Sequence, residues 1–229
     1  SITLLDKTTG ASYRGLNTFE DVGDVGDEYN HDPPSQDKTY SSENLAAKIT
    51  PCTSGSARCT LKIEYDLVLP IGATNDRKTR SSTLVSCPAA CYVSLYPGVP
   101  RVDFKLELVN NAKDHRLRIL FPTGMKCQHS YADLAFHVIE RSLELPDAKN
   151  WAETPMATYP MQSYVSAGDG RNGLTVATRG LHEYEVERDG TIAITLLRCV
   201  GWLSRDDLMT RSAPAGPIIQ TPDAQCQGR

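Results

Sequence analysis

Alternation of apolar and polar residues with a period of two is the feature of this sequence that most restricts its fold. The segment VDFKLELV, residues 102–109, places Val102, Phe104, Leu106 and Leu108 on one face and charged side chains between them. A β-strand with one solvated face has this period, whereas a helix repeats every 3.6 residues. The same pattern predicts strands at residues 60–69, 82–87, 91–95, 116–121, 134–141, 174–178, 183–187 and 191–199.

Turn-forming residues separate the predicted strands. The pairs Asn110-Asn111, Asn172-Gly173 and Asp189-Gly190, and the triplet at 122–124, favour tight reversals of the chain. No segment has the amphipathic pattern of a three-turn helix. The sequence therefore predicts an all-β protein, a large antiparallel β-sandwich that forms a single domain over residues 1–229. Residues 31–57 and 147–160 interrupt the pattern and are expected to be long loops, the second anchored by Trp151.

Composition excludes several classes of partner. The chain has 229 residues, 40% of them hydrophobic, and a formal net charge of −4. It can bury a core, but it has no basic cluster for nucleic acid and no apolar run long enough to cross a membrane. The seven cysteines are an odd number in a chain that does not need disulfides, which favours free thiols in a reducing cytoplasm. Pairs at 52/59 and 87/91 stay open for an oxidising compartment.

Two motifs invite a chemical interpretation. The stretch FEDVGDVGDEYNHDPP, residues 19–34, repeats an aspartate every three residues at Asp21, Asp24 and Asp27. An EF-hand loop requires alternate acidic positions and a closing glutamate, so calcium is excluded, and a glycine-rich turn holds an acid–base pair poorly. Capping of turns is the simpler role for these aspartates. The stretch GDGRNG, residues 168–173, matches a dinucleotide fingerprint, but a predicted strand follows it, which indicates a hairpin.

Catalytic and metal-binding patterns are missing from the sequence. The five histidines are scattered, CxxxC at residues 87–91 has no second half, and no nucleophile motif is present. We therefore expect no catalytic residue and no metal ligand set. Spacing alone supports an all-β domain with sugar binding as one option.

Longer segments give the sequence a family resemblance. FEDVGDVGDEYNHDPP, VSLYPGVPRVDFKLELVNNAKDHRLRILFPTG, GLTVATRGLHEYEV, ITLLRCVGWLSRDDLMTR and AGPIIQTPDAQCQG follow one another in this order. The order resembles the β-rich C-terminal region of bacterial family 38 glycoside hydrolases, which are retaining α-mannosidases and mannosylglycerate hydrolases. The resemblance implies a super-sandwich similar to that of galactose mutarotases. It also implies that the catalytic barrel with its zinc is absent from this chain, which would then be inactive alone.

The resemblance also implies substrate-binding residues. In the family, a tyrosine and an arginine of the β region reach toward the sugar site of the barrel. Tyr29 matches the first, in a loop whose Asp27 we include in the predicted substrate-binding set, and Arg198 is the preferred match to the second. Arg179 and Arg211 are the rival arginines. The simpler alternatives are a domain contact for Tyr29, and solvent exposure or a pair with Asp206 or Asp207 for Arg198.

The expected function is therefore a non-catalytic β-sandwich that buttresses a mannosidase catalytic domain and helps to form its sugar site. The expected partner is a mannose-containing glycoside, reached through the catalytic domain in a bacterial cytoplasm. A homo-oligomer is a further expectation, because exposed strand edges pair readily. The alternative is a stand-alone carbohydrate-binding or mutarotase-like epimerase domain, which would need a histidine and an acid in one groove.

Overall fold

The computed structural model describes residues 1–228 and contains 16 strands and no helix over that range. The strands are β1 Ile2–Leu5, β2 Ser12–Leu16, β3 Thr18–Gly23, β4 Tyr40–Ser41, β5 Lys48–Ser54, β6 Cys59–Pro70, β7 Leu84–Leu95, β8 Val102–Leu108, β9 His115–Pro122, β10 His129–Leu134, β11 His137–Ser142, β12 Thr158–Pro160, β13 Tyr164–Gly168, β14 Gly173–Ala177, β15 Glu183–Val186 and β16 Thr191–Cys199.

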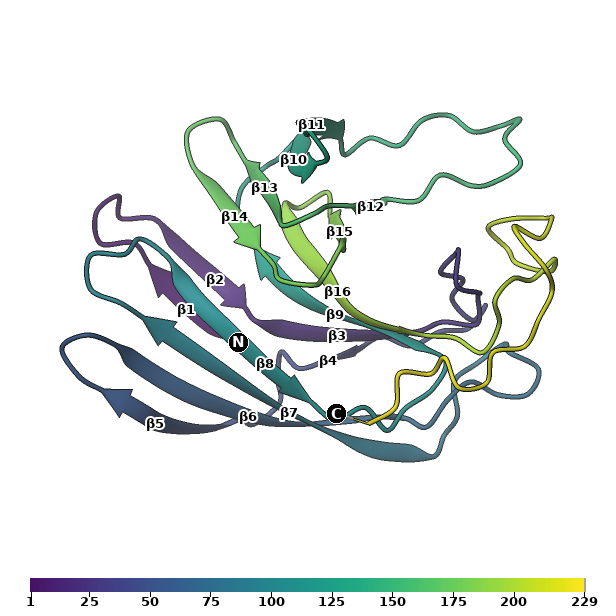
Figure 1. Cartoon of the computed structure of the whole chain (residues 1–229), viewed down its shortest axis with the longest axis horizontal. Helices are drawn as coiled ribbons and strands as arrows, with labels where there is room; N and C mark the ends of the chain where they lie inside the picture. The colour runs from purple at the N-terminus through teal and green to yellow at the C-terminus, as the bar shows by residue number, and fades with distance from the viewer. Residues whose placement is uncertain (229) are drawn as a thin grey trace.

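Four sheets are formed, and all their pairings are antiparallel. The largest has six strands in the order β12-β15-β16-β9-β3-β4, and two four-stranded sheets have the orders β5-β6-β7-β8 and β11-β10-β13-β14. β1 and β2 form a small fourth sheet. In Figure 1 the β5–β8 sheet lies at the bottom, β3, β9 and β16 cross the middle, and β10 to β14 lie at the top. The prediction of an all-β antiparallel sandwich is confirmed.

The core lies between the six-stranded sheet and the β5–β8 sheet, and it extends to the β10–β14 sheet through Ala132, Val165 and Ala167. Phe19 of β3 meets Tyr65 of β6 edge to face with ring centroids 5.4 Å apart, and Phe121 of β9 meets Phe104 of β8 at 5.6 Å. Such pairs add to the stability that burial of the rings already provides. Because side chains alternate along each strand, the face of the six-stranded sheet opposite this core is free to carry polar groups.

One long strand replaces two predicted ones. Residues 82–87 and 91–95 belong to β7, which continues through Pro88. Pro88 lies opposite Asp66 in β6, and its carbonyl accepts the amide of Val109 at 3.0 Å on the β8 side. An N–H at position 88 would point to the same side, toward β8. The regular pairing of β7 with β8 ends at Ala89 and Leu108, so no β8 carbonyl needs this donor. The proline is tolerated because it removes a donor just beyond the ladder.

The strand predicted at residues 134–141 exists but begins later, since β11 covers residues 137–142. The chain reverses there between β10 and β11, which pair from Leu134 with His137 to His129 with Ser142. Phe136 takes a positive φ of 67° in the turn, with its ring in solvent. An apolar residue at a turn tip gives no turn signal, so the alternation in the sequence continues across the turn.

Loop predictions had mixed outcomes. The stretch 31–57 contains β4 and β5, which were not predicted, and Trp151 is 61% exposed and does not anchor its loop. GDGRNG is a hairpin, as predicted, closed by Gly168 opposite Gly173 between β13 and β14. All seven cysteines are free thiols, and Cys87 and Cys91 lie four residues apart on one strand, about 13 Å, too far to bridge.

Candidate functional site

The three-residue aspartate repeat builds a loop that is held by arginines. Asp21, Asp24 and Asp27 are almost completely buried, and each accepts hydrogen bonds from one arginine distant in sequence. The pairs are Asp21 with Arg80, Asp24 with Arg198, and Asp27 with Arg211. A buried carboxylate is stable only when it is paired and hydrogen-bonded. Asp24 and Asp27 also accept backbone amides within the loop after β3, as turn capping requires, whereas Asp21 lies in β3 and caps no turn.

Asp24 and Arg198 join the start of this loop to the end of β16. The Arg198 Nε donates to Asp24 Oδ2 at 2.9 Å, and its terminal nitrogens donate to the carbonyls of Asp27 at 2.8 Å and Glu28 at 3.4 Å. Burial raises the pKa of Asp24 to about 6, against the opposing effect of Arg198. Arg198 pairs with neither Asp206 nor Asp207, since Asp207 is bound by Arg77 and Arg205.

Asp27 organises the tip of the loop. Its Oδ1 accepts the amides of Tyr29 and Asn30 at 3.0 and 2.9 Å, and its Oδ2 accepts the Arg205 amide at 2.8 Å besides the Arg211 guanidinium. The residue is 0% exposed. Both carboxylate oxygens of Asp27 thus accept hydrogen bonds from described protein groups, and Asp27 holds the loop in place from its buried side.

Tyr29 is presented outward by this loop. Its side chain is 55% exposed, its ring lies 6.0 Å from the Arg211 guanidinium, and its hydroxyl lies close to Gly216. Gly26 permits the tight turn beneath it, since a Cβ there would meet the Asn30 carbonyl oxygen at 2.1 Å. The Tyr29 side chain is therefore exposed to solvent, while hydrogen bonds to Asp27 restrain the backbone of the loop that carries it.

A charged face of the six-stranded sheet adjoins the loop. Arg118 in β9 donates to Glu20 of β3, to Glu185 at 2.7 Å and to Glu187 at 3.0 Å. Two residues earlier on the same face, Arg116 lies opposite Arg198 in the register of β9 and β16. Burial raises the pKa of Glu187, against the effect of Arg118.

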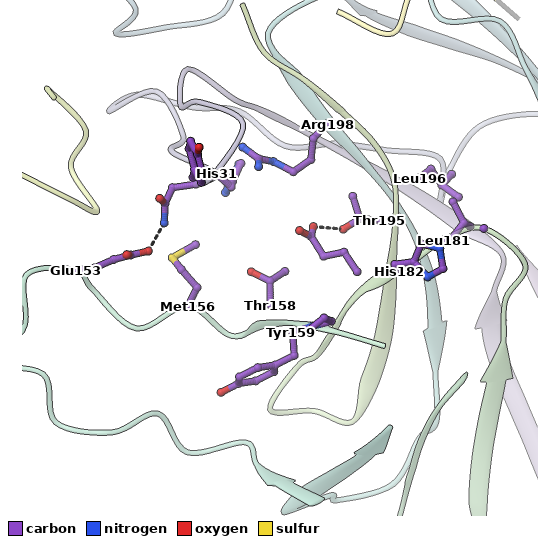
Figure 2. A pocket seen from close by; sticks show the side chains of 15 residues that line it. His31, Glu153, Met156, Thr158, Tyr159, Leu181, His182, Thr195, Leu196 and Arg198 are labelled. Atoms are coloured by element: carbon purple, nitrogen blue, oxygen red, sulfur yellow. Dashed lines mark hydrogen bonds between the residues drawn. The ribbon is translucent and has the colours of Figure 1, made fainter. Parts of the chain in front are cut away.

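A cavity of about 530 Å³ opens between this sheet face, the Tyr29 loop and the segment that leads into β12. Figure 2 shows side chains from all three around it. The polar lining includes His31, Glu153, His182, Glu183, Thr195 and Arg198, and Tyr29 and Tyr159 add aromatic surface. Thr195 donates to Glu183 at 2.6 Å, and Leu196 enters the lining where a β-bulge shifts the register of β16.

The predicted substrate-binding residues have different positions. Tyr29 and Arg198 both line the cavity, and Asp27 lies beneath the loop between them. Arg179 is exposed and lies outside the lining, although its neighbour Gly180 contributes to it. Arg211 is buried against Asp27. The role of these residues in substrate binding stays a prediction.

Several lining residues were missed from the sequence. His31, Glu153 and Glu183 come from three separate segments, and only the folded chain brings them together. Glu183 carries a weak signal, since it alternates with buried Tyr184 in β15 and must therefore face away from the core. His31 and Glu153 lie in segments without periodicity and give none.

Within residues 1–228 no group of three or more His, Cys, Asp or Glu side chains is placed to hold a metal ion. Over that part of the chain no helix has the length and apolar character that a membrane span requires.

Comparison with known proteins gives this geometry a context. Residues 2–223 match the model of the glycosyl hydrolases family 38 C-terminal domain. The chain is 37% identical to a Halalkalibacterium halodurans protein named "Putative mannosylglycerate hydrolase", covering 100% of this chain and 26% of that protein.

Two solved structures of family 38 proteins have the same fold as this chain. An α-mannosidase from Enterococcus faecalis superposes with a TM-score of 0.88 at 34% identity, over 99% of this chain and 26% of that one. A family 38 glycosyl hydrolase from the same species gives 0.87 at 33% identity, over 100% of this chain and 27% of that one. The chain thus spans about a quarter of the length of the relatives it matches.

Proposed function

Because the chain belongs to the glycosyl hydrolase family 38 C-terminal domains, we propose that its cavity is one wall of the sugar site of an α-mannosidase-type enzyme. The catalytic groups would come from a region outside this chain. In this role the β-sandwich buttresses the catalytic domain, encloses the substrate and contributes contacts without taking part in the chemistry. The proposed substrate is a mannose-containing glycoside.

The cavity itself is the observation that carries this proposal. It combines two tyrosine rings with carboxylates, a hydroxyl and an arginine. Sugars are bound by this combination, because a ring face stacks on aromatic surface while hydroxyls exchange hydrogen bonds with carboxylates and guanidinium groups. Tyr29 stands at the rim, where its hydroxyl can donate to a sugar oxygen.

Arg198 would act mainly as a positioning residue. It holds the Tyr29 loop through Asp24 and two backbone carbonyls, and it presents only its remaining N–H groups to the cavity. Zinc, a retaining mechanism with a covalent glycosyl-enzyme intermediate, and a cytoplasmic location remain proposals for the whole enzyme, based on the family.

Turnover of an aryl α-mannoside tests whether the catalytic groups lie outside this chain. The purified 229-residue chain, with zinc added, should release no aryl alcohol above the blank, because the proposal places the catalytic groups outside this chain. Steady turnover that tracks with the protein through a second purification would refute the assignment of catalysis to another region.

A second function has one observation in its favour. The cavity brings His31 and His182 together with Glu153 and Glu183, although the histidines are scattered in sequence. A histidine and a carboxylate in one groove are the groups that an aldose epimerase of the mutarotase type requires. Polarimetry of freshly dissolved α-D-glucose and α-D-mannose would detect accelerated mutarotation, and a rate equal to that of buffer would exclude this activity.

A further inference from the structure

Glu183 is a carboxylate of the cavity that forms no ion pair within residues 1–228. Other acids of this sheet face are paired there, because Arg118 binds three glutamates and Arg198 binds Asp24. Glu183 accepts instead from a neutral group, the Thr195 hydroxyl, at 2.6 Å, and charge attraction to arginine acts on it only at longer range. A half-buried carboxylate of this kind keeps unused capacity to accept hydrogen bonds.

One oxygen of Glu183 is held and the other is open. Thr195 donates to Oε1, whereas Oε2 has no hydrogen-bond partner among residues 1–228. None of the buried, unpartnered polar atoms of that range belongs to Glu183, so Oε2 is in contact with solvent. Glu183 lines the cavity, on the opposite side of β15 from buried Tyr184, and Figure 2 shows the hydrogen bond from Thr195 inside it. Oε2 is therefore an acceptor available to a ligand.

Thr195 fixes the direction of this carboxylate. It follows Ile194, which lies opposite Tyr184 in the register of β15 and β16, so its hydroxyl stands beside Glu183. Thr195 is 8% exposed, and its single O–H is used on Glu183. Because Oε1 is bound, the carboxylate cannot turn freely and Oε2 keeps one direction.

The groups that Oε2 can bind follow from its chemistry. An ionised carboxylate accepts hydrogen bonds and donates none, so the ligand group must be a donor. Among the lining side chains Glu153 and Glu183 are acidic, and the basic Arg198 is already bound to Asp24, which disfavours a ligand carboxylate or phosphate. The cavity of about 530 Å³ lies within the roughly 300–1,000 Å³ of small-molecule sites. A neutral sugar that donates through a hydroxyl group fits these conditions.

We propose that Glu183 determines specificity in the cavity, its Oε2 accepting a hydrogen bond from one hydroxyl group of a bound neutral pyranoside. That hydroxyl acts as the donor, and the carboxylate takes no part in bond cleavage. Thr195 is a positioning residue, which acts through Glu183 and does not need to touch the sugar. The inference rests on the proposed sugar site and names the group that reads one hydroxyl of its ligand.

Deoxyfluoro sugars test the direction of this hydrogen bond in the unaltered chain. Methyl α-D-mannopyranosides that carry fluorine in place of the 2-, 3-, 4- or 6-hydroxyl keep the shape of the sugar but cannot donate at that position. One of them should bind about tenfold to hundredfold more weakly than the parent mannoside in a titration followed by backbone amide shifts, because a hydrogen bond to a charged group is lost.

Glu183→Gln should abolish this discrimination. The amide can accept from Thr195 with its oxygen and then presents its NH2 group, a donor, to the cavity. The variant should therefore bind the parent mannoside more weakly, and the sensitive fluoro analogue about as well as the parent. Thr195→Val keeps the charge of Glu183 but releases Oε1, so the discrimination should shrink, and Thr195→Ser, which keeps the hydroxyl, should retain it. A merely structural role would not move this ratio.

Matched controls separate recognition from folding. Glu144→Gln and Thr175→Val make the same changes at exposed positions outside the cavity lining and should leave both the affinity and the discrimination unchanged. Urea unfolding of each variant reports whether the fold is kept, and the fluoro panel on the unaltered chain needs no variant at all.

The outcomes are distinguishable. Saturable binding with every fluoro analogue bound as tightly as the parent would overturn the role of Glu183 and leave the sugar site standing. Discrimination that persists in Glu183→Gln would overturn it as well, because another acceptor would then read the hydroxyl. D-glycerate binding more tightly than the neutral mannoside would overturn the choice of a neutral ligand. A complete lack of saturable shifts in the cavity of the unaltered chain would overturn the proposed sugar site and this inference together.

Discussion

Replacing Asp27 with asparagine tests the arginine-held loop most severely. The asparagine side chain has the same shape, and its oxygen can still accept the amides of Tyr29 and Asn30. It removes the charge opposite Arg211, however, and places an amide NH2 donor where the Arg205 amide and the Arg211 guanidinium now donate. Arg211 is then left buried, at 7% exposure, without a carboxylate.

The expected loss follows from this burial. Breaking a buried ion pair by removing one partner costs about 3–5 kcal/mol, which lowers Tm by roughly 6–20 °C in a domain of this size. Urea unfolding followed by tryptophan fluorescence measures the loss as a shift of the midpoint at constant slope. Removing both charges, with Asp27→Asn and Arg211→Met together, should recover part of the stability.

Asp207→Asn is the matched control. Asp207 also pairs with arginine, with Arg77 at 3.1 Å and Arg205 at 2.8 Å, but its side chain is 51% exposed. An exposed pair of this kind contributes at most about 1 kcal/mol. If Asp27→Asn cost no more than Asp207→Asn, the reasoning that the buried pairs fix the loop would be refuted.

Three further predictions concern the same region. The pKa of His31 is lower in the folded than in the unfolded chain, so its contribution to stability is lost as pH falls from about 6.5 toward 3. The unfolding of the unaltered chain near pH 5 should therefore take up about one proton more than the unfolding of His31→Phe. An unchanged dependence of the unfolding free energy on pH in His31→Phe would contradict this. Gly26→Ala brings a Cβ within 2.1 Å of the Asn30 carbonyl oxygen and should cost roughly 1–3 kcal/mol in urea unfolding, whereas Gly98→Ala, where no atom lies within 4 Å but φ is positive, should cost less. Tyr29→Phe should change the unfolding free energy by less than about 0.5 kcal/mol because the side chain is exposed, while weakening mannoside binding; a large loss of stability would reassign Tyr29 to structure.

The sequence predicted the strands better than the contacts between them. Alternation and apolar content identified β6, β8, β9, β14, β15 and β16; exposure alternates along β6 and β15, whereas β9 and β16 are buried on both faces. The prediction failed at Phe136, where an apolar residue occupies a turn, and at Pro88, where a strand tolerates proline beyond the end of its ladder. Each failure reflects a local exception that tertiary context permits.

The site was only partly accessible to the same reasoning. The aspartate repeat predicted a turn-rich loop, and the family resemblance selected Tyr29 and Arg198, which both line the cavity. The partners of the aspartates could not be predicted, since Arg80, Arg198 and Arg211 come from distant segments. Arg116 looked like one more polar position in an alternating strand, and only the register beside Arg198 shows how it is placed.

Titration of the ¹⁵N-labelled chain with methyl α-D-mannopyranoside, followed by backbone amide spectra, tests the central claim most directly. The account predicts saturable shifts concentrated at Tyr29, His31, Glu183 and Thr195, which line the cavity beside the Tyr29 loop. Saturable shifts confined to the second cavity, around Lys126 and Arg171, or no saturable shift at all, would contradict it.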